Sequence, residues 1–319
     1  MIIVQMMGNL GNQMFIYAMA RSLQLEYGDD IVIDLGGLKR FYYSAAYKLD
    51  HLNLPKERIK YGLDIIAPAV RNKYLKTSRL YHIEQKLYRK IRKDSLVPDK
   101  VTMRWLKKGC YYTFSRSYFD FPKTTAKNKF VYGYFQNAKY FDKYADVIRS
   151  ECRVLDELDD YDKMTLPLIQ NLNSVAVSVR AINELGVSFI DFDYYYRAME
   201  MLDEQLDNPT FFVFSDNVEA TKEKMRFPYP VKYITPTDAC HGLRLMYNCK
   251  HFVIANSTFS WWGAYLGNDP AKIIVMPDKI DKEGAGREGY YFKGAIKIPC
   301  SFVDYKLDLD QIIHQKYAR

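Results

Sequence analysis

The sequence predicts an α/β protein with two mostly parallel sheets, and three observations lead to that prediction. Short apolar runs alternate with segments of helical periodicity along the chain, which is typical of parallel strands joined by helices. These runs form two sets, one before about residue 165 and one after it. A chain of 319 residues with 48% apolar content is also long enough to build two cores of ordinary size.

Apolar runs mark the expected strands, and helical patterns separate several of them. The expected strands are Ile2–Met6, Ile31–Ile33, Phe130–Tyr134, Val175–Val179, Phe211–Phe214, Val231–Ile234, Phe252–Ala255 and Ile273–Met276. The expected helices include Gln13–Tyr27, Tyr194–Leu206, Ala239–Cys249 and a C-terminal helix near Leu307–Lys316. We expect the last strand to end at Pro277 and the hinge to include the polar stretch Asp156–Lys163. The two domains then span residues 1–165 and 166–319.

The composition argues against several classes of protein. No apolar run reaches the roughly 18 residues of a transmembrane helix, and MIIVQMMGNLGNQMF begins as a strand rather than as a signal peptide. The five cysteines are scattered and form no CxxC pair. We therefore expect reduced thiols in a cytoplasmic protein, without a disulfide framework or a zinc site.

The net charge of +8 belongs to one segment. Nine Lys or Arg residues and the single acid Glu84 lie between Arg71 and Lys93, which leaves the rest of the chain neutral. Apolar residues recur there at helical spacing and predict an amphipathic basic helix; they are Leu80, Ile83, Leu87 and Ile91. Three interpretations stay open: contact with an anionic membrane surface, contact with a polyanion, or a solvated helix face. Nucleic acid is not expected, because no nucleic-acid-binding module accompanies the segment.

The segment His251–Gly267, HFVIANSTFSWWGAYLG, joins a short apolar strand, a loop rich in hydroxyl groups and the start of a helix. The first amides of a helix have no partner within the helix and carry partial positive charge. A loop containing Ser257 and Thr258 at such a point therefore predicts a phosphate site. An ordinary capped helix is the alternative interpretation.

Polar residues follow other strands as well, and ligands of open α/β sheets bind at the carboxyl ends of strands. The first strand leads into Gly8–Gln13, where glycine allows close backbone approach, although an ordinary strand-to-helix turn is the alternative interpretation. Arg180 follows Val175–Val179, and a cation there calls for either a phosphate or a structural carboxylate as its partner. Ser215-Asp216-Asn217 suits a ribose or a base edge, although Asp216 also suits the N-cap of the next helix.

A metal site is not expected. Asp191-Phe192-Asp193 resembles the DxD metal site of some sugar-nucleotide transferases, but Asp193 also suits the N-cap of the following helix. The five histidines show no ligand spacing.

Four segments are distinctive when they are taken together and in order. They are GNLGNQMFIYA (Gly8–Ala18), YGYFQNAKYF (Tyr132–Phe141), FVFSDN (Phe212–Asn217) and DACHGLRLMYNCKHFVIANSTFSWWGAYL, which begins at Asp238. With them the chain resembles bacterial α-1,2-fucosyltransferases of glycosyltransferase family 11. The resemblance implies a GT-B fold, with an N-terminal acceptor-side domain (residues 1–165) and a C-terminal nucleotide-sugar-binding domain (residues 166–319), both Rossmann-like and facing each other across a cleft.

The resemblance also implies GDP-fucose as the donor, no metal or other cofactor, and inversion at the transferred sugar. We expect the donor-binding residues to be Gly11, Asn12, Gln13, Ser178, Asp216, Asn217, Asn256, Ser257, Thr258 and Phe259. Arg180 and Glu184 are the expected catalytic residues, with Arg180 stabilising the leaving phosphate. The position at strand ends makes Glu184, Asp34 and Asp191 candidates for the general base, and Glu184 is preferred. Alternatively, the leaving phosphate itself takes the proton of the acceptor.

One motif departs from the family pattern. Where the family usually reads HxRRGDY, this chain reads Ser178-Val179-Arg180-Ala181-Ile182-Asn183-Glu184, and Asn217 replaces the second acid of FSDD. In the family, the arginine kept here as Arg180 contacts the diphosphate, whereas the lost histidine and one of the acids contribute to guanine recognition. We therefore expect intact phosphate binding and altered base recognition.

These observations lead us to expect an α-1,2-fucosyltransferase. It would act on a terminal galactose-type hexose of a surface polysaccharide, a glycolipid or a lipid-linked oligosaccharide. Two alternatives stay open: a transferase of the same fold with another nucleotide-sugar donor, and a catalytically silent homologue that binds glycan or nucleotide. The expected location is the cytoplasm, with peripheral attachment to the inner face of the cytoplasmic membrane through residues 71–93.

Overall fold

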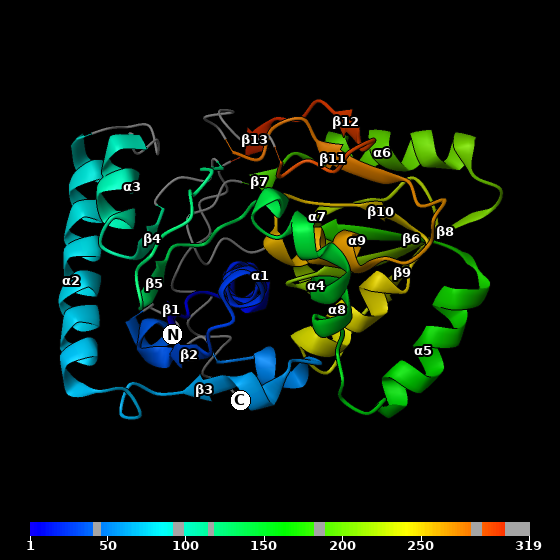
Figure 1. Ribbon diagram of the computed structural model, residues 1–319. Helices are drawn as coiled ribbons and strands as arrows, with labels where there is room; N and C mark the ends of the chain where they lie inside the picture. Colours follow the sequence, from blue (N-terminus) through cyan, green and yellow to red (C-terminus); the bar gives the residue numbers. More distant parts are fainter. Residues whose placement is uncertain (41–45, 92–98, 114–117, 182–188, 282–288, 304–319) are drawn as a thin grey trace, which may run out of the picture. The chain divides into compact units, whose positions relative to one another are not determined.

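The computed structural model describes residues 1–40, 46–91, 99–113, 118–181, 189–281 and 289–303, and the chain divides into two compact units (Figure 1). Unit 1 is Met1–Asp156 with Ala285–Tyr291, and unit 2 is Glu157–Gly284 with Phe292–Arg319. Each unit contains a parallel sheet and helices, so the predicted α/β class is confirmed. The boundary expected after residue 165 falls inside helix α5 (Asp160–Asn171), which packs on strand β6 (Asn173–Val179) of unit 2.

Unit 1 has a five-stranded parallel sheet in the order β3-β2-β1-β5-β4. Its strands are β1 (Ile2–Gln5), β2 (Ile31–Asp34), β3 (Ile59–Tyr61), β4 (Cys110–Tyr112) and β5 (Lys129–Tyr132). The central strand β1 is buried throughout, as its continuous apolar run predicts. The sequence did not predict β3 and β4, because three residues carry too little periodicity to indicate a strand.

Helix α1 (Leu10–Tyr27) connects β1 to β2 and is buried along most of its length. Gly8, at φ 72°, turns the chain between β1 and α1, and Gly28, at φ 73°, ends the helix. Both values lie in the left-handed region that glycine adopts without steric cost. The shorter helical segments of unit 1 are η1 (Leu35–Arg40), η2 (Leu49–His51), η3 (Lys56–Arg58), η4 (Ala138–Tyr140), η5 (Asp142–Tyr144) and α4 (Ala145–Glu151).

Helices α2 (Pro68–Ile91) and α3 (Asp99–Leu106) contribute to a tyrosine-rich core in unit 1. Tyr74 and Tyr81 of α2 both stack on Tyr132 of β5, with 5.4 Å between the ring centroids in each pair. The Tyr132 hydroxyl donates a hydrogen bond to the Tyr74 carbonyl at 2.9 Å. The face of α2 that packs on the sheet is therefore aromatic, with each buried hydroxyl close to a polar partner.

Unit 2 has a six-stranded parallel sheet in the order β12-β11-β10-β6-β8-β9. Besides β6, its strands are β8 (Pro209–Ser215), β9 (Val231–Ile234), β10 (His251–Val253), β11 (Ile274–Pro277) and β12 (Ile296–Ile298). The prediction that the last strand ends at Pro277 is wrong, because β12 pairs with β11 beyond it. The expected helix near Leu307–Lys316 lies outside the described residues.

The other helices of unit 2 are α6 (Phe192–Gln205), α7 (Val218–Lys224), α8 (Ala239–Tyr247) and α9 (Thr258–Leu266). A short antiparallel pair, β7 (Phe189–Ile190) and β13 (Phe302–Val303), forms a separate ribbon. Among the described residues, no helix combines the length and hydropathy that crossing a membrane requires.

Candidate functional site

The polar residues predicted in the second half of the chain gather at one edge of the unit 2 sheet. Strand β6 lies between β10 and β8, and both neighbours run parallel to it. The three carboxyl ends therefore meet at the same edge, which is where open α/β sheets bind ligands. Arg180 follows β6, Asp216 follows β8, and the loop Asn256–Ser257 links β10 to α9.

Asp216 holds the segment that carries Arg180. One oxygen of the Asp216 carboxylate accepts a hydrogen bond from the Ala181 amide at 2.7 Å, and the other lies 4.0 Å from the Arg180 Nε atom. The predicted carboxylate partner of Arg180 thus exists, but at a distance that leaves the guanidinium loosely paired. With 24% of its side chain exposed, Arg180 keeps access to a ligand. A partly exposed guanidinium at a strand end suits a phosphate.

Tyr195 supports the same segment from α6. Its ring is buried, and its hydroxyl lies close to the Arg180 backbone. Burial raises the pKa of Tyr195 above its usual value, while the Arg180 backbone acts in the opposite direction. Tyr195 is therefore a neutral phenol that packs beside the backbone of Arg180.

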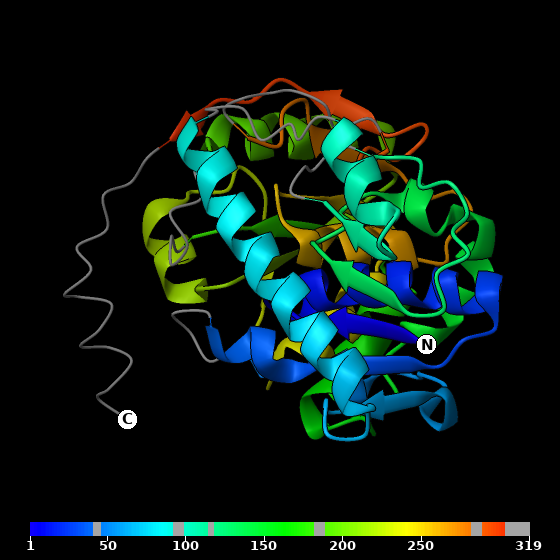
Figure 2. The same cartoon turned by 60° about the vertical axis from the view of Figure 1, so that its left-hand side comes forward.

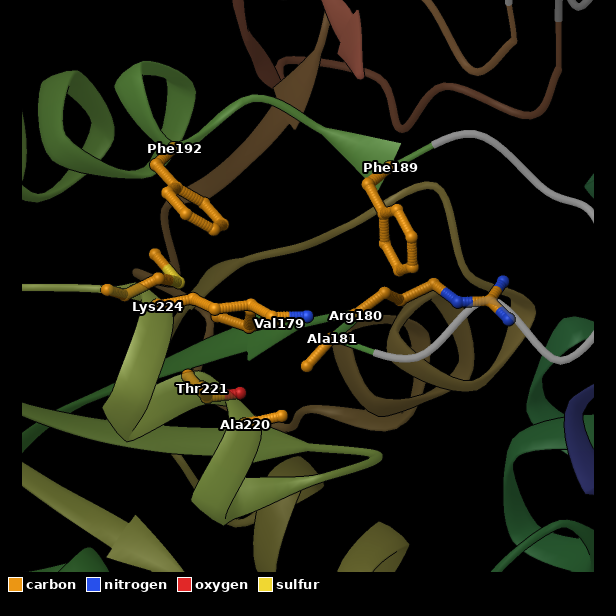
Figure 3. A pocket seen from close by; sticks show the side chains of 9 residues that line it. Val179, Arg180, Ala181, Phe189, Phe192, Ala220, Thr221 and Lys224 are labelled. Carbon is orange, nitrogen blue, oxygen red and sulfur yellow. The ribbon is translucent and has the colours of Figure 1, made fainter. Parts of the chain in front are cut away.

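A small hollow of about 10 Å³, enough for about one water molecule, lies beside Arg180 (Figure 3). It is lined by Val179, Arg180, Ala181, Phe189, Phe192, Ala220, Thr221, Lys224 and Met225. Figure 3 shows the phenyl rings of Phe189 and Phe192 on one side and Ala220 and Thr221 of α7 on the other, with the Lys224 amine reaching between them and the Arg180 guanidinium pointing away. The walls of the hollow are therefore largely apolar, and two cationic residues, Arg180 and Lys224, contribute to its lining. Sequence reasoning missed Phe189 and Lys224, because neither lies in a recognisable motif.

Asn217, and not Asp216, caps helix α7. The Asn217 side-chain oxygen accepts a hydrogen bond from the Ala220 amide at 2.8 Å. The Ser215 hydroxyl accepts from the Asn217 amide at 3.1 Å and lies 2.7 Å from the Thr221 hydroxyl. The N-cap interpretation of Asp216 is therefore wrong by one residue, since the β8 register brings Asp216 toward the end of β6 instead.

The loop before α9 is held by its own polar groups. The Asn256 side-chain amide donates to the Ile280 carbonyl at 3.3 Å, and the Ser260 hydroxyl donates to the Ser257 carbonyl at 3.0 Å. Ser257 is the N-cap residue of α9, yet within the described part of the chain its hydroxyl caps no amide of that helix. The first turn, with Thr258 and Phe259, is thus not closed by a serine cap, which favours the phosphate interpretation.

Packing sets the position of α9. Trp261 and Trp262 are buried, and Trp261 stacks on Tyr265 and Phe292 at centroid distances of 4.8 and 4.9 Å. A Cβ atom at Gly263 would come within 2.3 Å of the Met246 sulfur of α8. The two tryptophans are therefore core residues, and a glycine at 263 allows α8 to approach closely.

The residues predicted in the first half of the chain lie in unit 1 and make structural contacts. Gln13 is fully buried, donates to the Gly8 and Ala46 carbonyls at 2.8 and 2.9 Å, and accepts from the Lys48 amide at 3.0 Å. The side-chain oxygen of Asn12 accepts a hydrogen bond from the side-chain amide of Gln136 at 2.8 Å. With Gly11, which is buried at the start of α1, these residues hold the turn between β1 and α1.

Two predicted site residues remain, Ser178 of the donor-binding set and the catalytic candidate Glu184. Ser178 is buried near the end of β6, with 6% of its surface exposed. Glu184, the expected general base, lies outside the described residues.

Asp191, the first residue of the DxD pair, binds backbone amides of unit 2. One Asp191 oxygen accepts from the Tyr194 amide at 3.0 Å and the other accepts from the Ser301 amide. Asp191 therefore caps α6, and the expectation that Asp193 does so is wrong.

Among the described residues, one cluster has the composition of a metal site: Asp159, Asp162 and His241. Asp162 is fully buried, and one of its oxygens lies 2.7 Å from His241 Nδ1 and 2.8 Å from Arg244 Nη1. The Arg244 guanidinium already neutralises that carboxylate. The cluster joins the start of α5 to α8.

The chain is similar to known proteins in sequence and in fold. A model of the family described as Glycosyl transferase family 11 matches residues 1–317. The chain is 27% identical over 294 residues to an alpha-1,2-colitosyltransferase of Escherichia coli, covering 86% of this chain and 91% of the relative. It is 25% identical over 289 residues to the O-antigen biosynthesis glycosyltransferase WbnK of Escherichia coli, covering 85% and 92%. Among solved structures, the fucosyltransferase NodZ from Bradyrhizobium superposes with a TM-score of 0.49 at 13% identity, covering 86% of this chain and 95% of that one.

Proposed function

This chain belongs to glycosyltransferase family 11, and on that premise we propose that it is an inverting α-1,2-fucosyltransferase that uses GDP-fucose. The observation that carries the proposal is the gathering of Arg180, Asp216 and the start of α9 at one edge of the unit 2 sheet. Such an edge can bind a sugar diphosphate through a guanidinium and backbone amides.

The reaction requires stabilisation of the leaving group. When the bond between C1 of the sugar and the diphosphate oxygen breaks, negative charge grows on the phosphate. Arg180 and the backbone amides at Ser257–Thr258 are hydrogen-bond donors that can stabilise this negative charge without a metal ion or another cofactor. One such donor is typically worth about 3 kcal/mol in the transition state.

The acceptor hydroxyl attacks C1 from the face opposite the leaving phosphate, which inverts the configuration. Its oxygen forms the new bond to C1, and its proton passes either to Glu184, the proposed general base, or to the departing diphosphate. A terminal galactose-type hexose of a surface polysaccharide or glycolipid is the proposed acceptor, and reaction at its O2 atom would give the α-1,2 linkage.

The base of the donor is proposed to bind beside Arg180. The phenyl rings of Phe189 and Phe192 lie near Arg180, and Asp216 and Ser178 lie at the neighbouring strand ends. The Ser178 hydroxyl is smaller than the histidine of the family pattern. We therefore expect the guanine contacts to differ from those of the family while the phosphate contacts are retained.

A second donor is favoured by one relative. The matched alpha-1,2-colitosyltransferase is named for transfer of colitose, which is fucose without the hydroxyl at C3. The two sugars differ by one polar group, and a site that hydrogen-bonds a hydroxyl rejects an analogue that lacks it. GDP-colitose is therefore the second candidate donor.

The test has two stages. In the first, GDP, UDP and ADP are titrated into the purified protein by calorimetry, and we expect GDP to bind most tightly. Binding of UDP alone would contradict the fucosyl proposal. In the second, kcat/KM is compared for GDP-fucose and GDP-colitose with β-galactoside acceptors, and the product linkage is determined by NMR. We expect the larger value with GDP-fucose; a reversed ratio would assign the chain as a colitosyltransferase, and tight GDP binding without turnover would contradict both.

A further inference from the structure

Helix α2 presents an apolar stripe to solvent. Leu80, Ile83 and Leu87 are 42%, 55% and 50% exposed, and their spacing places them on one side of the helix. The opposite side, with Tyr74 and Tyr81, packs into unit 1. The side chain of Ile91, predicted to extend the stripe, lies outside what the structure describes. Figure 2 brings α2 to the front, where it runs as one long helix. The aliphatic stripe is therefore not needed to attach α2 to unit 1.

Basic side chains accompany the stripe. Lys76, Arg79 and Lys86 are exposed on the same helix. The single acid of the segment, Glu84, accepts hydrogen bonds from Trp105 Nε1 at 2.7 Å and the Tyr112 hydroxyl at 3.1 Å, and it pairs with Arg104. Because Glu84 is held by α3 and β4, it does not offset the basic charge beside the stripe.

The apolar stripe and the exposed basic side chains together indicate which kind of partner α2 can bind. A polyanion such as nucleic acid binds through its phosphates and would leave three exposed aliphatic side chains uncovered. A second copy in a two-fold contact would bring the same basic residues of both chains together. An anionic lipid surface satisfies both features at once, because its headgroups attract the cations and its acyl boundary receives the apolar stripe.

We propose that α2 is a docking surface for an anionic membrane, on which it lies parallel to the lipid surface with Leu80, Ile83 and Leu87 inserted. The proposal is independent of which sugar the enzyme transfers. It places the enzyme at a surface where a lipid-linked acceptor would be concentrated.

The test measures partitioning of the full-length protein onto phosphatidylcholine vesicles with and without phosphatidylglycerol. We expect binding to the anionic vesicles only, and weaker binding as salt rises. The triple variant Lys76→Gln, Arg79→Gln and Lys86→Gln should bind roughly 100-fold more weakly, since each cation near such a surface contributes about fivefold. The double variant Ile83→Gln and Leu87→Gln should lose at least about tenfold.

A matched control is available on α5, where Met164 and Leu168 are 66% and 49% exposed and the first turn of the helix is acidic. The variant Met164→Gln and Leu168→Gln should bind vesicles like the wild type. Thermal midpoints of all variants, and turnover on a soluble acceptor, should stay near the wild-type values. Equal binding to neutral vesicles, undiminished binding by either α2 variant, or a dimer that only the stripe variant dissociates would overturn the proposal. So would binding to RNA but not to vesicles.

Discussion

At the scale of single residues, the candidate site depends on how firmly Arg180 is held. The neighbouring Ala181 amide is held by Asp216, and the buried Tyr195 hydroxyl lies close to the Arg180 backbone. Its guanidinium lies 4.0 Å from the Asp216 carboxylate, which leaves donors available for an anion. A cation in a well-held segment whose head group is only loosely paired can be preorganised for a phosphate. Its guanidinium donors are not all taken by other protein groups.

The first prediction concerns Arg180 itself. Arg180→Ala should lower kcat by roughly 100-fold or more, because one preorganised donor to the leaving phosphate is lost. The measurement is steady-state transfer from the donor identified in the screen, with circular dichroism to verify the fold. Arg197→Ala, an exposed arginine on α6 that donates to the Pro299 carbonyl, is the matched control and should retain turnover. A folded Arg180→Ala enzyme of normal turnover would remove Arg180 from the mechanism.

A second prediction concerns stability in unit 1. Glu151 accepts from the Tyr17 hydroxyl at 2.6 Å and pairs with Arg21 at 2.6 Å, and all three residues are buried. Burial, with the nearby Glu151 carboxylate, raises the pKa of Tyr17 well above its usual value. Glu151→Ala leaves the Arg21 guanidinium buried without its carboxylate and should cost about 3–5 kcal/mol. Urea unfolding measures this cost; the exposed Glu200→Ala should change stability little, and an equal effect of both would contradict the buried-network explanation.

At the scale of elements, polar side chains tie segments that are distant in sequence to α1. Glu26, in the last turn of α1, accepts from Lys143 at 2.7 Å and from the Tyr144 hydroxyl at 3.0 Å, and it pairs with Lys123 at 2.5 Å. Hydrogen bonds from Lys123, and then from Lys143 and Tyr144, lower the pKa of Glu26 to about 2. This one carboxylate thus joins α1 to the segments around residues 123 and 143.

The third prediction is the pH dependence of that junction. A carboxyl group whose pKa falls from 4.5 to about 2 on folding contributes stability that is present above pH 4.5 and is lost as the pH falls toward 2. The difference in urea midpoint between wild type and Glu26→Gln should therefore be largest near pH 6 and shrink as the pH falls below 4.5. Asn53→Asp, an exposed change elsewhere in unit 1, is a control for general charge effects. A difference that stays constant with pH would show that the low pKa does not contribute.

At the scale of the whole molecule, the chain consists of two units with similar secondary structure and different local chemistry. The predicted donor-binding residues of unit 2 lie along the edge formed by β8, β6 and β10. Those of unit 1 are Gly11, Asn12 and Gln13, and the side chains of the last two are already engaged in hydrogen bonds within their own unit. We therefore expect unit 2 to supply most of the donor contacts.

The fourth prediction separates the two units by hydrogen exchange. Saturating GDP should slow amide exchange at residues 178–181, 215–217 and 255–259, because a bound ligand stabilises the structure around its contacts. Peptides covering β2 and β3 of unit 1 should be unaffected and are the internal control. Protection of residues 9–13 would support the predicted role of Gly11, Asn12 and Gln13. GDP binding with no protection in unit 2 would contradict the proposed site.

The amino-acid sequence by itself determined the α/β class, most of the strands and the two loops that the family motifs mark. These features follow from local patterns, because buried parallel strands need continuous apolar runs and helix starts need recognisable loops. Arg180 could be singled out for the same reason, since a charge directly after a buried strand is unusual.

Only the tertiary structure decided which polar residues cap helices and which hold the ends of neighbouring strands. Asp216, an expected N-cap, instead accepts a hydrogen bond from the Ala181 amide at the end of β6. Asn217 caps α7, and Asp191 rather than Asp193 caps α6. The short strands β3, β4 and β12 and the pocket of Phe189 and Lys224 likewise came from packing between distant segments. The physical reason is that caps, registers and pockets depend on distances between elements, and sequence periodicity carries information about the faces of an element but not about its neighbours.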